Sequence, residues 1–203
     1  NAVCLRPIVL IVPEGSMLNP RFPAAVVAGN VEVSQIVTDA LFAALGRLGT
    51  AQGTMNNLTI GNERVQYYET ASGVHTHMTN TRMTDPEILE SRFPVVLDHF
   101  GIDRGSGGRG RWNAGDGVTR RIRFREAVDC SILSERRRVP SPGLNGGEDG
   151  RLGNNSILRA DGSCEDLGGS GEASAKPGDA IEIQTPTGGG FGPASARRSE
   201  RGE

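Results

Sequence analysis

The chain has 203 residues, enough for one large domain or two small ones, and either size can bury a hydrophobic core. Its 22 basic and 24 acidic residues are interspersed and leave a formal net charge of -2, which argues against the concentrated positive field of a nucleic-acid-binding protein. Aromatic residues make up only 4% of the chain and 29 residues are Gly, so we expect many turns, loops and close backbone approaches.

The cysteines and the apolar stretches exclude several further classes. Cys4, Cys130 and Cys164 stand far apart with no second Cys or His beside them, so we interpret them as reduced packing residues and expect no zinc or redox motif. The longest apolar stretch, near residues 8–12, falls far short of the roughly 20 residues that cross a bilayer. No charged-then-apolar signal segment opens the chain, and the sequence therefore predicts a cytoplasmic location.

The first half of the chain is predicted to mix strands and helices. Residues 5–12 are rich in β-branched side chains and stop at a Pro-Glu-Gly turn, which predicts a buried strand. Over residues 30–48, apolar side chains recur at three- and four-residue steps, which predicts a long helix. Short strands are predicted near 58–60 and 65–68. Asp85-Pro86-Glu87 supplies the cap, the proline and the acidic group that open a short helix.

The second half is predicted to be mostly β. Glycines interrupt the chain after residue 103, and four later stretches have the composition of strands: 118–126, 128–135, 155–160 and 180–184. The expected fold is therefore α+β, with one long and one short helix in the first half and a β-rich, sandwich- or barrel-like second half. We divide the chain into an α+β segment, a Gly-rich mostly-β segment and a disordered tail: 1–103, 104–194 and 195–203.

The densest polar cluster lies between Ser72 and Arg82 and contains two histidines. In an extended segment His75 and His77 point to the same face, about 7 Å apart along the chain, so both can address one ligand or metal. The alternative is structural, with these side chains fixing the loop that enters the short helix, and the pattern leaves both readings open. A metal needs further ligands, and the nearby candidates in the sequence are Glu69, Asp85 and His99.

Two more polar clusters have both a binding and a structural interpretation. Asn30, Ser34 and Gln35 stand at the start of the long helix, where backbone N–H groups favour anions, although ordinary N-capping explains them as well. The amides of Asn56 and Asn57 have the donors and acceptors that read a lactam or imide edge, but they also suit turn chemistry.

Three other motifs carry less information. The runs at 105–110 and 187–192 are Gly-rich, but they lack the Gly-Lys-Ser/Thr context of a phosphate-binding loop, so we interpret them as tight β connections. The charge run 136–138 is typical of a solvated strand end, and one of its arginines facing a cleft is the alternative.

The stretch SGVHTHMTNTRMTDPEILESRFP, residues 72–94, resembles the 5-oxoprolinase/hydantoinase B family. The resemblance extends over nearly the whole chain, because shorter matching motifs lie on both sides of that stretch. They are Arg21-Phe22-Pro23-Ala24-Ala25, Gly29-Asn30, 52–57, Tyr67-Tyr68-Glu69-Thr70, 104–108, Gly115-Asp116-Gly117, Arg136-Arg137, Gly146-Gly147 and 185–192. One departure is that only Ala71 separates Thr70 from Ser72, where the family carries a longer Gly-rich segment.

The resemblance implies a function that this chain performs only together with other parts. Family members use ATP to hydrolyse or carboxylate small carbonyl compounds, and their B-type part works with an A-type part similar to actin-like ATPases. The chain looks like the C-terminal portion of a B-type part, from the same polypeptide as the A-type part or a separate subunit. We expect ATP and a divalent cation, Mg²⁺, to bind mainly outside it, and the isolated fragment to be inactive. A homo-oligomer is also expected, with no nucleic-acid or membrane partner.

The motifs look closest to 5-oxoprolinase, which opens the lactam of 5-oxo-L-proline to give L-glutamate. Phosphorylation of the lactam oxygen, as the family chemistry implies, creates the leaving group that an unstrained amide lacks. An ATP-dependent hydantoinase or an acetone-type carboxylase is the alternative, with this segment mainly a structural or assembly module. On the resemblance, the catalytic candidates are His75, His77 and Glu69. The substrate-binding candidates are Asn30, Asn56, Asn57, Asn80 and Arg82, and no metal-ligand set is evident.

Overall fold

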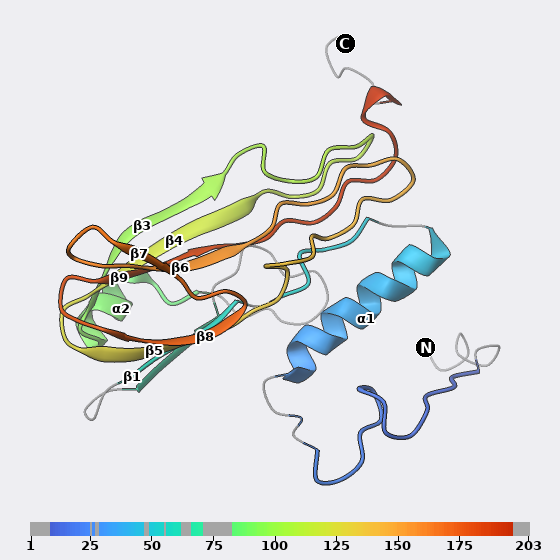
Figure 1. Ribbon diagram of the computed structural model, residues 1–203. Helices are drawn as coiled ribbons and strands as arrows, with labels where there is room; N and C mark the ends of the chain where they lie inside the picture. The colour runs from blue at the N-terminus through green and yellow to red at the C-terminus, as the bar shows by residue number, and fades with distance from the viewer. Residues whose placement is uncertain are drawn as a thin grey trace.

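The computed structural model describes residues 9–24, 26, 29–46, 49–54, 56–61, 66–70 and 83–196 of the chain (Figure 1). Two antiparallel β-sheets face each other, and a long helix lies beside them (Figure 1). The helices are α1 (Gly29–Leu45), α2 (Pro86–Arg92) and a short 3-10 helix, η2 (Ala194–Ala196). The strands are β1 (Asn57–Gly61), β2 (Gln66–Thr70), β3 (Val95–Asp103), β4 (Gly117–Phe124), β5 (Val128–Leu133), β6 (Asn154–Leu158), β7 (Cys164–Asp166), β8 (Ser170–Ala175) and β9 (Ala180–Gln184).

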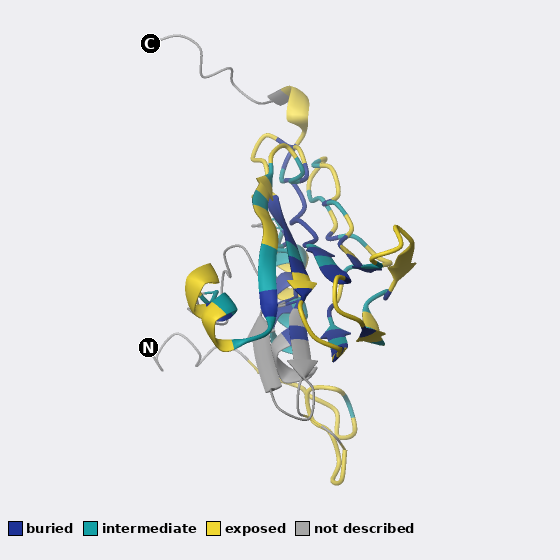
Figure 2. Ribbon diagram, turned by 90° about the vertical axis from the view of Figure 1, so that its left-hand side faces the viewer, coloured by how far each residue is buried: buried dark blue, intermediate teal, exposed yellow. Residues whose placement is uncertain are grey.

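The sheets combine strands from distant parts of the sequence. The four-stranded sheet has the order β2-β1-β5-β8, and the five-stranded sheet has the order β3-β4-β9-β6-β7. Buried residues lie on the faces that the sheets turn toward each other, as the dark band between the layers shows in Figure 2. The architecture is thus a β-sandwich, in which alternate residues of each strand point inward.

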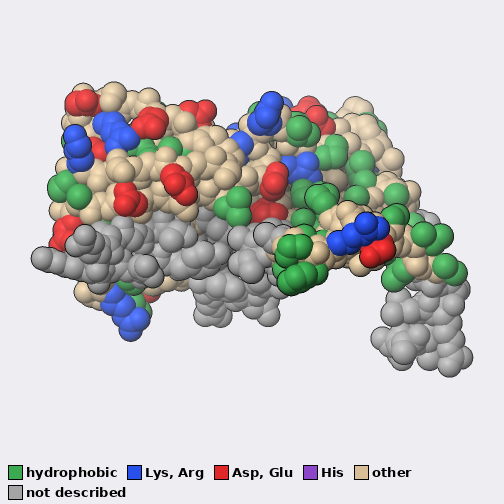
Figure 3. Space-filling model, turned by 60° about the horizontal axis from the view of Figure 1, so that its bottom comes forward, with side chains coloured by type: hydrophobic (Ala, Val, Ile, Leu, Met, Phe, Trp, Pro, Cys, Tyr) green, Lys and Arg blue, Asp and Glu red, His purple; other side chains and the backbone are tan. Residues whose placement is uncertain are grey.

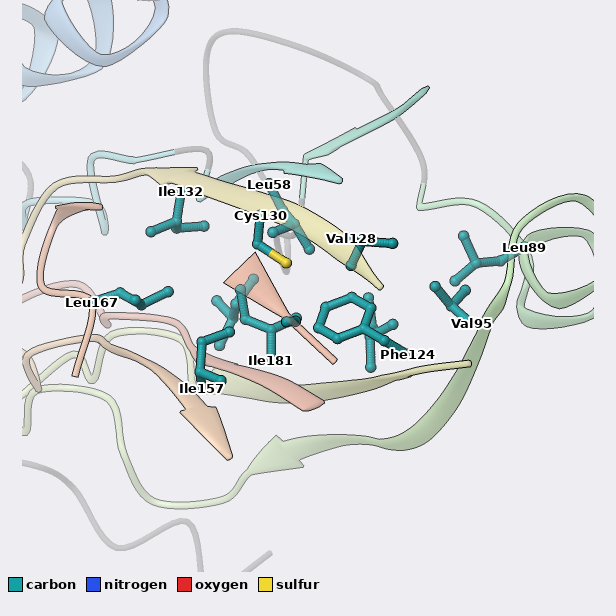
Figure 4. Packing of buried hydrophobic residues seen from close by; sticks show 13 residues of the cluster. Leu58, Leu89, Val95, Phe124, Val128, Cys130, Ile132, Ile157, Leu167 and Ile181 are labelled. Carbon is teal, nitrogen blue, oxygen red and sulfur yellow. The ribbon is translucent and has the colours of Figure 1, made fainter. Parts of the chain in front are cut away.

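The core between the sheets consists mainly of aliphatic side chains, with Phe124 as its aromatic member. Phe124 of β4 and Ile181 of β9 point toward Val128 and Cys130 of β5 across the gap (Figure 4). Each fully buried apolar side chain of this size contributes roughly 1.5–3 kcal/mol. Further members are Leu58, Leu89, Val95, Ile122, Ile132, Ile157, Leu167, Ala175 and Ile183.

Helix α2 closes one end of the sandwich and has the cap that the sequence predicts. The side chain of Asp85 accepts a hydrogen bond from the backbone N–H of Glu87 at 3.0 Å, and Pro86 stands at the first helical position. The helix ends where the N–H of Phe93 bonds to the carbonyl of Leu89. Leu89 is completely buried beside the core, so the capped helix anchors the start of β3.

At the opposite end, Gly-rich segments cross one another with no room for side chains. The N–H of Gly108 donates to the carbonyl of Gly188 at 3.1 Å, and the N–H of Leu144 donates to the carbonyl of Gly190 at 2.9 Å. A Cβ on Gly108 or Gly190 would lie under 3.0 Å from backbone atoms of the neighbouring segments. These glycines therefore permit direct backbone-to-backbone packing.

The predicted fold class is confirmed, with two helices in the first half and antiparallel sheets after them. The strands predicted near 118–126, 128–135, 155–160 and 180–184 correspond to β4, β5, β6 and β9. The sequence analysis predicted no strand over the residues of β3, β7 and β8. The segment boundary at residue 104 stays a prediction, and both sheets mix strands from its two sides. The predicted tail lies outside the described residues from residue 197 onward, and its first two residues belong to η2.

The strand predicted over residues 5–12 is wrong for the part that the structure describes. Residues 9–12 form no strand, and Val9, Leu10 and Ile11 are 84%, 82% and 86% exposed. A run of β-branched residues predicts that a surface will be covered, but it does not say by which chain. Residues 1–8 lie outside the described part.

Candidate functional site

The face that helix α1 buries is polar. Glu32, Gln35 and Asp39 recur at steps of three and four residues, and they are only 5%, 1% and 3% exposed. Leu41 and Leu45, which belong to the apolar repeat that predicts the helix, are instead 63% and 67% exposed. This reverses the usual amphipathic arrangement, and buried charged groups of this kind need partners.

The partners come from the loop between α1 and β1. The carboxylate of Asp39 accepts a hydrogen bond from the N–H of Ala51 at 3.0 Å, and Glu32 accepts one from the hydroxyl of Thr54 at 3.1 Å. The same hydroxyl oxygen accepts hydrogen bonds from the backbone N–H groups of Asn56 and Glu135. Thr54 thus joins the helix, the loop and the segment that follows β5 at one point.

Asn56 is the polar residue at this junction with the least satisfied side chain. It is fully buried, its φ of 52° lies in the left-handed region, and neither atom of its amide has a partner among the described residues. Burying an unpaired amide costs free energy, and residues of unusual backbone conformation cluster at binding sites. Its nitrogen can donate and its oxygen can accept, which is the pattern that a cyclic amide complements, but the side chain is fully buried and lines neither of the two cavities described below.

The backbone places the end of β2 beside Asn56. In the ladder, Asn57 pairs with Thr70 and Leu58 pairs with Glu69, so the last residues of β2 lie opposite the first residues of β1. The chain leaves β2 there, only two residues before Ser72 in the sequence.

An open cavity of about 930 Å³ lies between α1, the N-terminal segment 11–18 and the residues after β5. Val33, Ile36 and Val37 of α1 form an apolar wall, and the run 134–139 supplies its charged end. Its volume is within the usual range for small-molecule sites. A second cavity, of about 630 Å³, lies on the other side of Gln35 and Asp39, against the Gly-rich loops.

Two arginines at the charged end are anchored differently. Arg137 donates to the carbonyl of Glu135 and to the side chain of Asn155, both at 2.7 Å. Burial lowers the pKa of Arg137 to about 10, while the carboxylates of Glu32 and Glu135 favour its charged form, so it remains a cation at neutral pH. Arg136 donates to the carbonyl of Pro140 at 3.2 Å and lies 3.9 Å from the carboxylate of Asp39.

The structure describes only part of the site predicted from the sequence. His75, His77, Asn80 and Arg82 lie outside the described residues. Of Asn30, Asn57 and Glu69, the structure describes the backbone, which lies in α1, β1 and β2. Asn56 is the one predicted site residue whose side chain is described, and it lies at the polar junction.

The sequence analysis did not single out Glu32, Asp39 or Thr54 of this junction. It interpreted Arg136 and Arg137 as part of a solvated charge run, with one arginine facing a cleft as the alternative. The sequence does contain a pattern that indicates Glu32 and Asp39. These acidic residues stand at helical spacing among apolar residues of the same helix, which is unusual for an amphipathic helix. Nothing local pointed to Thr54, since its three partners lie far apart in the sequence.

The described part of the chain has neither a cluster of metal-ligating side chains nor a membrane-spanning helix. It contains no group of three or more His, Cys, Asp or Glu side chains that could hold a metal ion. Within the same residues, every helix is too short or too polar to cross a membrane.

Comparison with known proteins shows which family the chain is similar to. The family described as hydantoinase B/oxoprolinase matches residues 1–194. The chain is 48% identical to 5-oxoprolinase 1 of Arabidopsis thaliana and 45% identical to the 5-oxoprolinase of Dictyostelium discoideum, in each case over 95% of its length. It spans 16% of the length of either relative.

A solved structure has the same fold. The ATP-dependent caprolactamase of Pseudomonas jessenii superposes with a TM-score of 0.75 at 20% identity, covering 93% of this chain and 38% of that one. A match to the family over residues 1–194, together with this fold, decides the assignment. The chain belongs to the hydantoinase B/oxoprolinase family.

Proposed function

We propose that the chain forms part of an ATP-dependent hydrolase that opens the amide ring of 5-oxo-L-proline to give L-glutamate. The observation that carries the proposal is the 45–48% identity to two 5-oxoprolinases across 95% of the chain. Because the chain spans 16% of those proteins, the complete reaction requires parts that lie beyond it.

The described residues do not fit a nucleotide. Most of the N–H groups described for the Gly-rich segments donate to carbonyl oxygens of a neighbouring segment or to side chains such as Asp116 and Asn113, which occupies donors that a phosphate would need. We propose that ATP and its Mg²⁺ bind to an A-type part and that the residues of this chain act on the ring.

Asn56 is the proposed contact for the ring amide. Its side-chain N–H group can donate to the ring carbonyl while its oxygen accepts from the ring N–H. Glu69, His75 and His77 remain the candidates for moving protons, because β2 brings Glu69 toward the same end of the sheet. Asn30, Asn57, Asn80 and Arg82 remain candidates for further polar contacts to the substrate.

The reaction is tested with the complete enzyme, including its A-type part. We expect glutamate release from 5-oxo-L-proline that depends on ATP and is lowered by His75→Ala or His77→Ala. His99→Ala is the matched control, because His99 is an exposed residue of β3. Wild-type enzyme that releases no glutamate but opens hydantoin would move the substrate to the hydantoinase alternative.

The role of Asn56 is tested by an isosteric change. Asn56→Asp removes the donor and keeps the shape, so we expect kcat/KM to fall about tenfold to a hundredfold, the effect of one or two lost hydrogen bonds. Asn145→Asp is the control, because Asn145 has a similar φ of 51° but is exposed. Equal activity of both variants would rule out a substrate contact by Asn56.

A second role, in assembly, is favoured by the exposed apolar surface. Hydrophobic side chains gather on the half of the molecule that carries α1 and the N-terminal segment (Figure 3). They include Val9, Leu10, Ile11, Met17, Phe22, Leu41 and Leu45. Surfaces of this kind mark interfaces, and an A-type part or a second copy of the chain is the proposed partner.

The assembly role is tested by size-exclusion chromatography of the complete enzyme. Replacing Leu41 and Leu45 by Asp should release the A-type part or lower the oligomeric state, whereas Ile88→Asp on the exposed side of α2 should change neither. Identical elution of all variants would contradict an interface at α1.

A further inference from the structure

The run Arg136-Arg137-Arg138 enters one cavity as a group because of an unusual backbone conformation. In an extended strand, successive side chains point to opposite faces, so at least one of three consecutive arginines would point away from any given cleft. Here all three line the 930 Å³ cavity. The φ of Arg136 is 60°, a left-handed value that is uncommon for a residue other than Gly and that ends the alternation after β5.

The guanidinium of Arg136 is positioned rather than mobile. Its side chain is 13% exposed, it bonds to the carbonyl of Pro140, and its Nε lies 3.3 Å from the place where a Cβ on Gly53 would be. Gly53 has a φ of 73°, so the loop that carries Asn56 passes directly beneath this arginine. The hydrogen bond to Pro140 holds the planar guanidinium of Arg136 in place. Because Gly53 has no side chain, the guanidinium can lie close to the polar junction around Thr54.

The donors of this guanidinium are only partly used. Arginine has five N–H donors, and among the described residues Arg136 donates to the carbonyl of Pro140. Its Nε is buried and has no partner among the described residues, and Asp39 is at 3.9 Å, beyond hydrogen-bonding distance. The buried Nε packs against Gly53, so the donors that a ligand oxygen in the cavity can reach are those of the terminal guanidinium nitrogens.

Arg137 and Glu32 have other tasks and do not compete for the same ligand. Arg137 bridges the carbonyl of Glu135 and the side chain of Asn155, which ties the turn to β6. Glu32 is held by the hydroxyl of Thr54. Arg138 lines the cavity as well but is exposed, so Arg136 is the half-buried arginine of this run with unused donors. A planar fork of donors is the group that pairs with a carboxylate.

We propose that Arg136 is a specificity-determining residue, whose guanidinium binds the carboxylate of a cyclic amide that carries one. The inference rests on the proposed function and deepens it. 5-Oxo-L-proline has a carboxylate on the carbon next to the ring nitrogen, whereas caprolactam and hydantoin have none. In this proposal Arg136 contacts the acid group of the substrate, and Asn56 is the contact proposed above for the ring amide.

The test compares substrates with and without the acid group, using the complete enzyme. Arg136→Met keeps an unbranched side chain but removes every donor, and Arg136→Lys keeps the charge without the planar fork. We expect Arg136→Met to raise KM for 5-oxo-L-proline by at least about tenfold, with a smaller rise for Arg136→Lys. ATP consumption with 2-pyrrolidone, the same ring without the carboxylate, should be unchanged.

Arg125→Met is the matched control, because Arg125 is exposed and does not line the cavity. Circular dichroism melts of all variants establish that they fold. An unchanged KM for 5-oxo-L-proline in Arg136→Met, or an equal loss with both ring compounds, overturns the proposal.

Calorimetric titration separates this proposal from the proposed function. If the wild-type enzyme releases no glutamate from 5-oxo-L-proline, the proposed function fails. Binding of 5-oxo-L-proline that is lost in Arg136→Met and kept in Arg125→Met would still support the carboxylate site. Wild-type protein that fails to bind 5-oxo-L-proline, or an Arg136→Met variant that binds it as well as wild type, refutes the site itself.

Discussion

Replacing Gly190 by Ala tests whether the crossing of the Gly-rich segments stabilises the fold. Gly190 is buried, its N–H donates to the carbonyl of Glu148 and its carbonyl accepts from Leu144, both at 2.9 Å. A Cβ at this position meets the backbone of Arg109 and lies 2.9 Å from the carbonyl oxygen of Gly108. Backbone atoms cannot rotate away as the end of a side chain can, so the neighbouring segments must separate.

The size of the effect follows from two contributions. Overpacking of this kind costs about 1–3 kcal/mol. Weakening two backbone hydrogen bonds adds about 1 kcal/mol for each. A total of about 4 kcal/mol is a large part of the 5–15 kcal/mol that stabilises a typical domain. For a chain of this length it lowers Tm by about 8–16 °C.

The assay is a thermal melt followed by circular dichroism, with Gly115→Ala as the matched control. Gly115 belongs to the same group of loops, but it is exposed and a Cβ there has no atom within 4 Å. The control should melt within about 2 °C of wild type, because an exposed substitution changes stability by only a few tenths of a kcal/mol. If Gly190→Ala melts with the control, the close backbone packing contributes little and the reasoning is refuted.

Three further predictions concern single side chains. Asp85→Ala should destabilise α2 by about 1 kcal/mol through loss of its cap, seen as faster hydrogen exchange over residues 86–92, while Ser91→Ala should not. Hydrogen bonds from the backbone N–H of Lys176, and then from Ala160 and Arg159, hold the pKa of Asp179 below its usual value. Ionised Asp179 therefore stabilises the fold at pH values above the usual Asp pKa, and this stabilisation is lost as the pH falls through the lowered pKa of Asp179. Acid titration of Asp179→Asn should therefore show less loss of stability below the ordinary Asp range than wild type shows, and parallel curves would contradict this. Burial raises the pKa of Cys130 to about 12, so iodoacetamide at pH 8 should modify exposed Cys164 and leave Cys130 unmodified until the protein is denatured, as peptide mass spectrometry can check.

The elements that the sequence predicted well are those whose signals are local. The Asp85-Pro86-Glu87 cap predicted α2, and the three- to four-residue apolar steps predicted α1. Strand β8, with the sequence SGEASA, escaped because it has few of the residues that strands favour and is held by its pairing with β5. What decides its structure is a neighbour more than thirty residues away.

The candidate site shows the same division between local and long-range information. Asn56 was predicted as a substrate contact from its residue type and its place in an amide-rich run, and this role stays a prediction. Arg136 was interpreted mainly as part of a solvated charge run, because its φ of 60° and its position above Gly53 are properties of the folded chain. The apolar run before Pro13 shows the limit in the other direction, since its composition predicts burial but not the surface that provides it.

Helix α1 has a polar inner face and an apolar outer face, which connects two properties that usually reside in separate parts of an enzyme. Glu32 and Asp39 hold the loop of Asn56 and the guanidinium of Arg136 from one side of the helix, and Leu41 and Leu45 face outward from the other. A partner that binds the outer face only when α1 is packed in place stabilises, by its binding free energy, the contacts that the inner face of α1 makes. If the proposed substrate contact of Arg136 holds, linkage requires that substrate binding strengthen the binding of that partner by the same factor, and one helix would then couple assembly to substrate affinity.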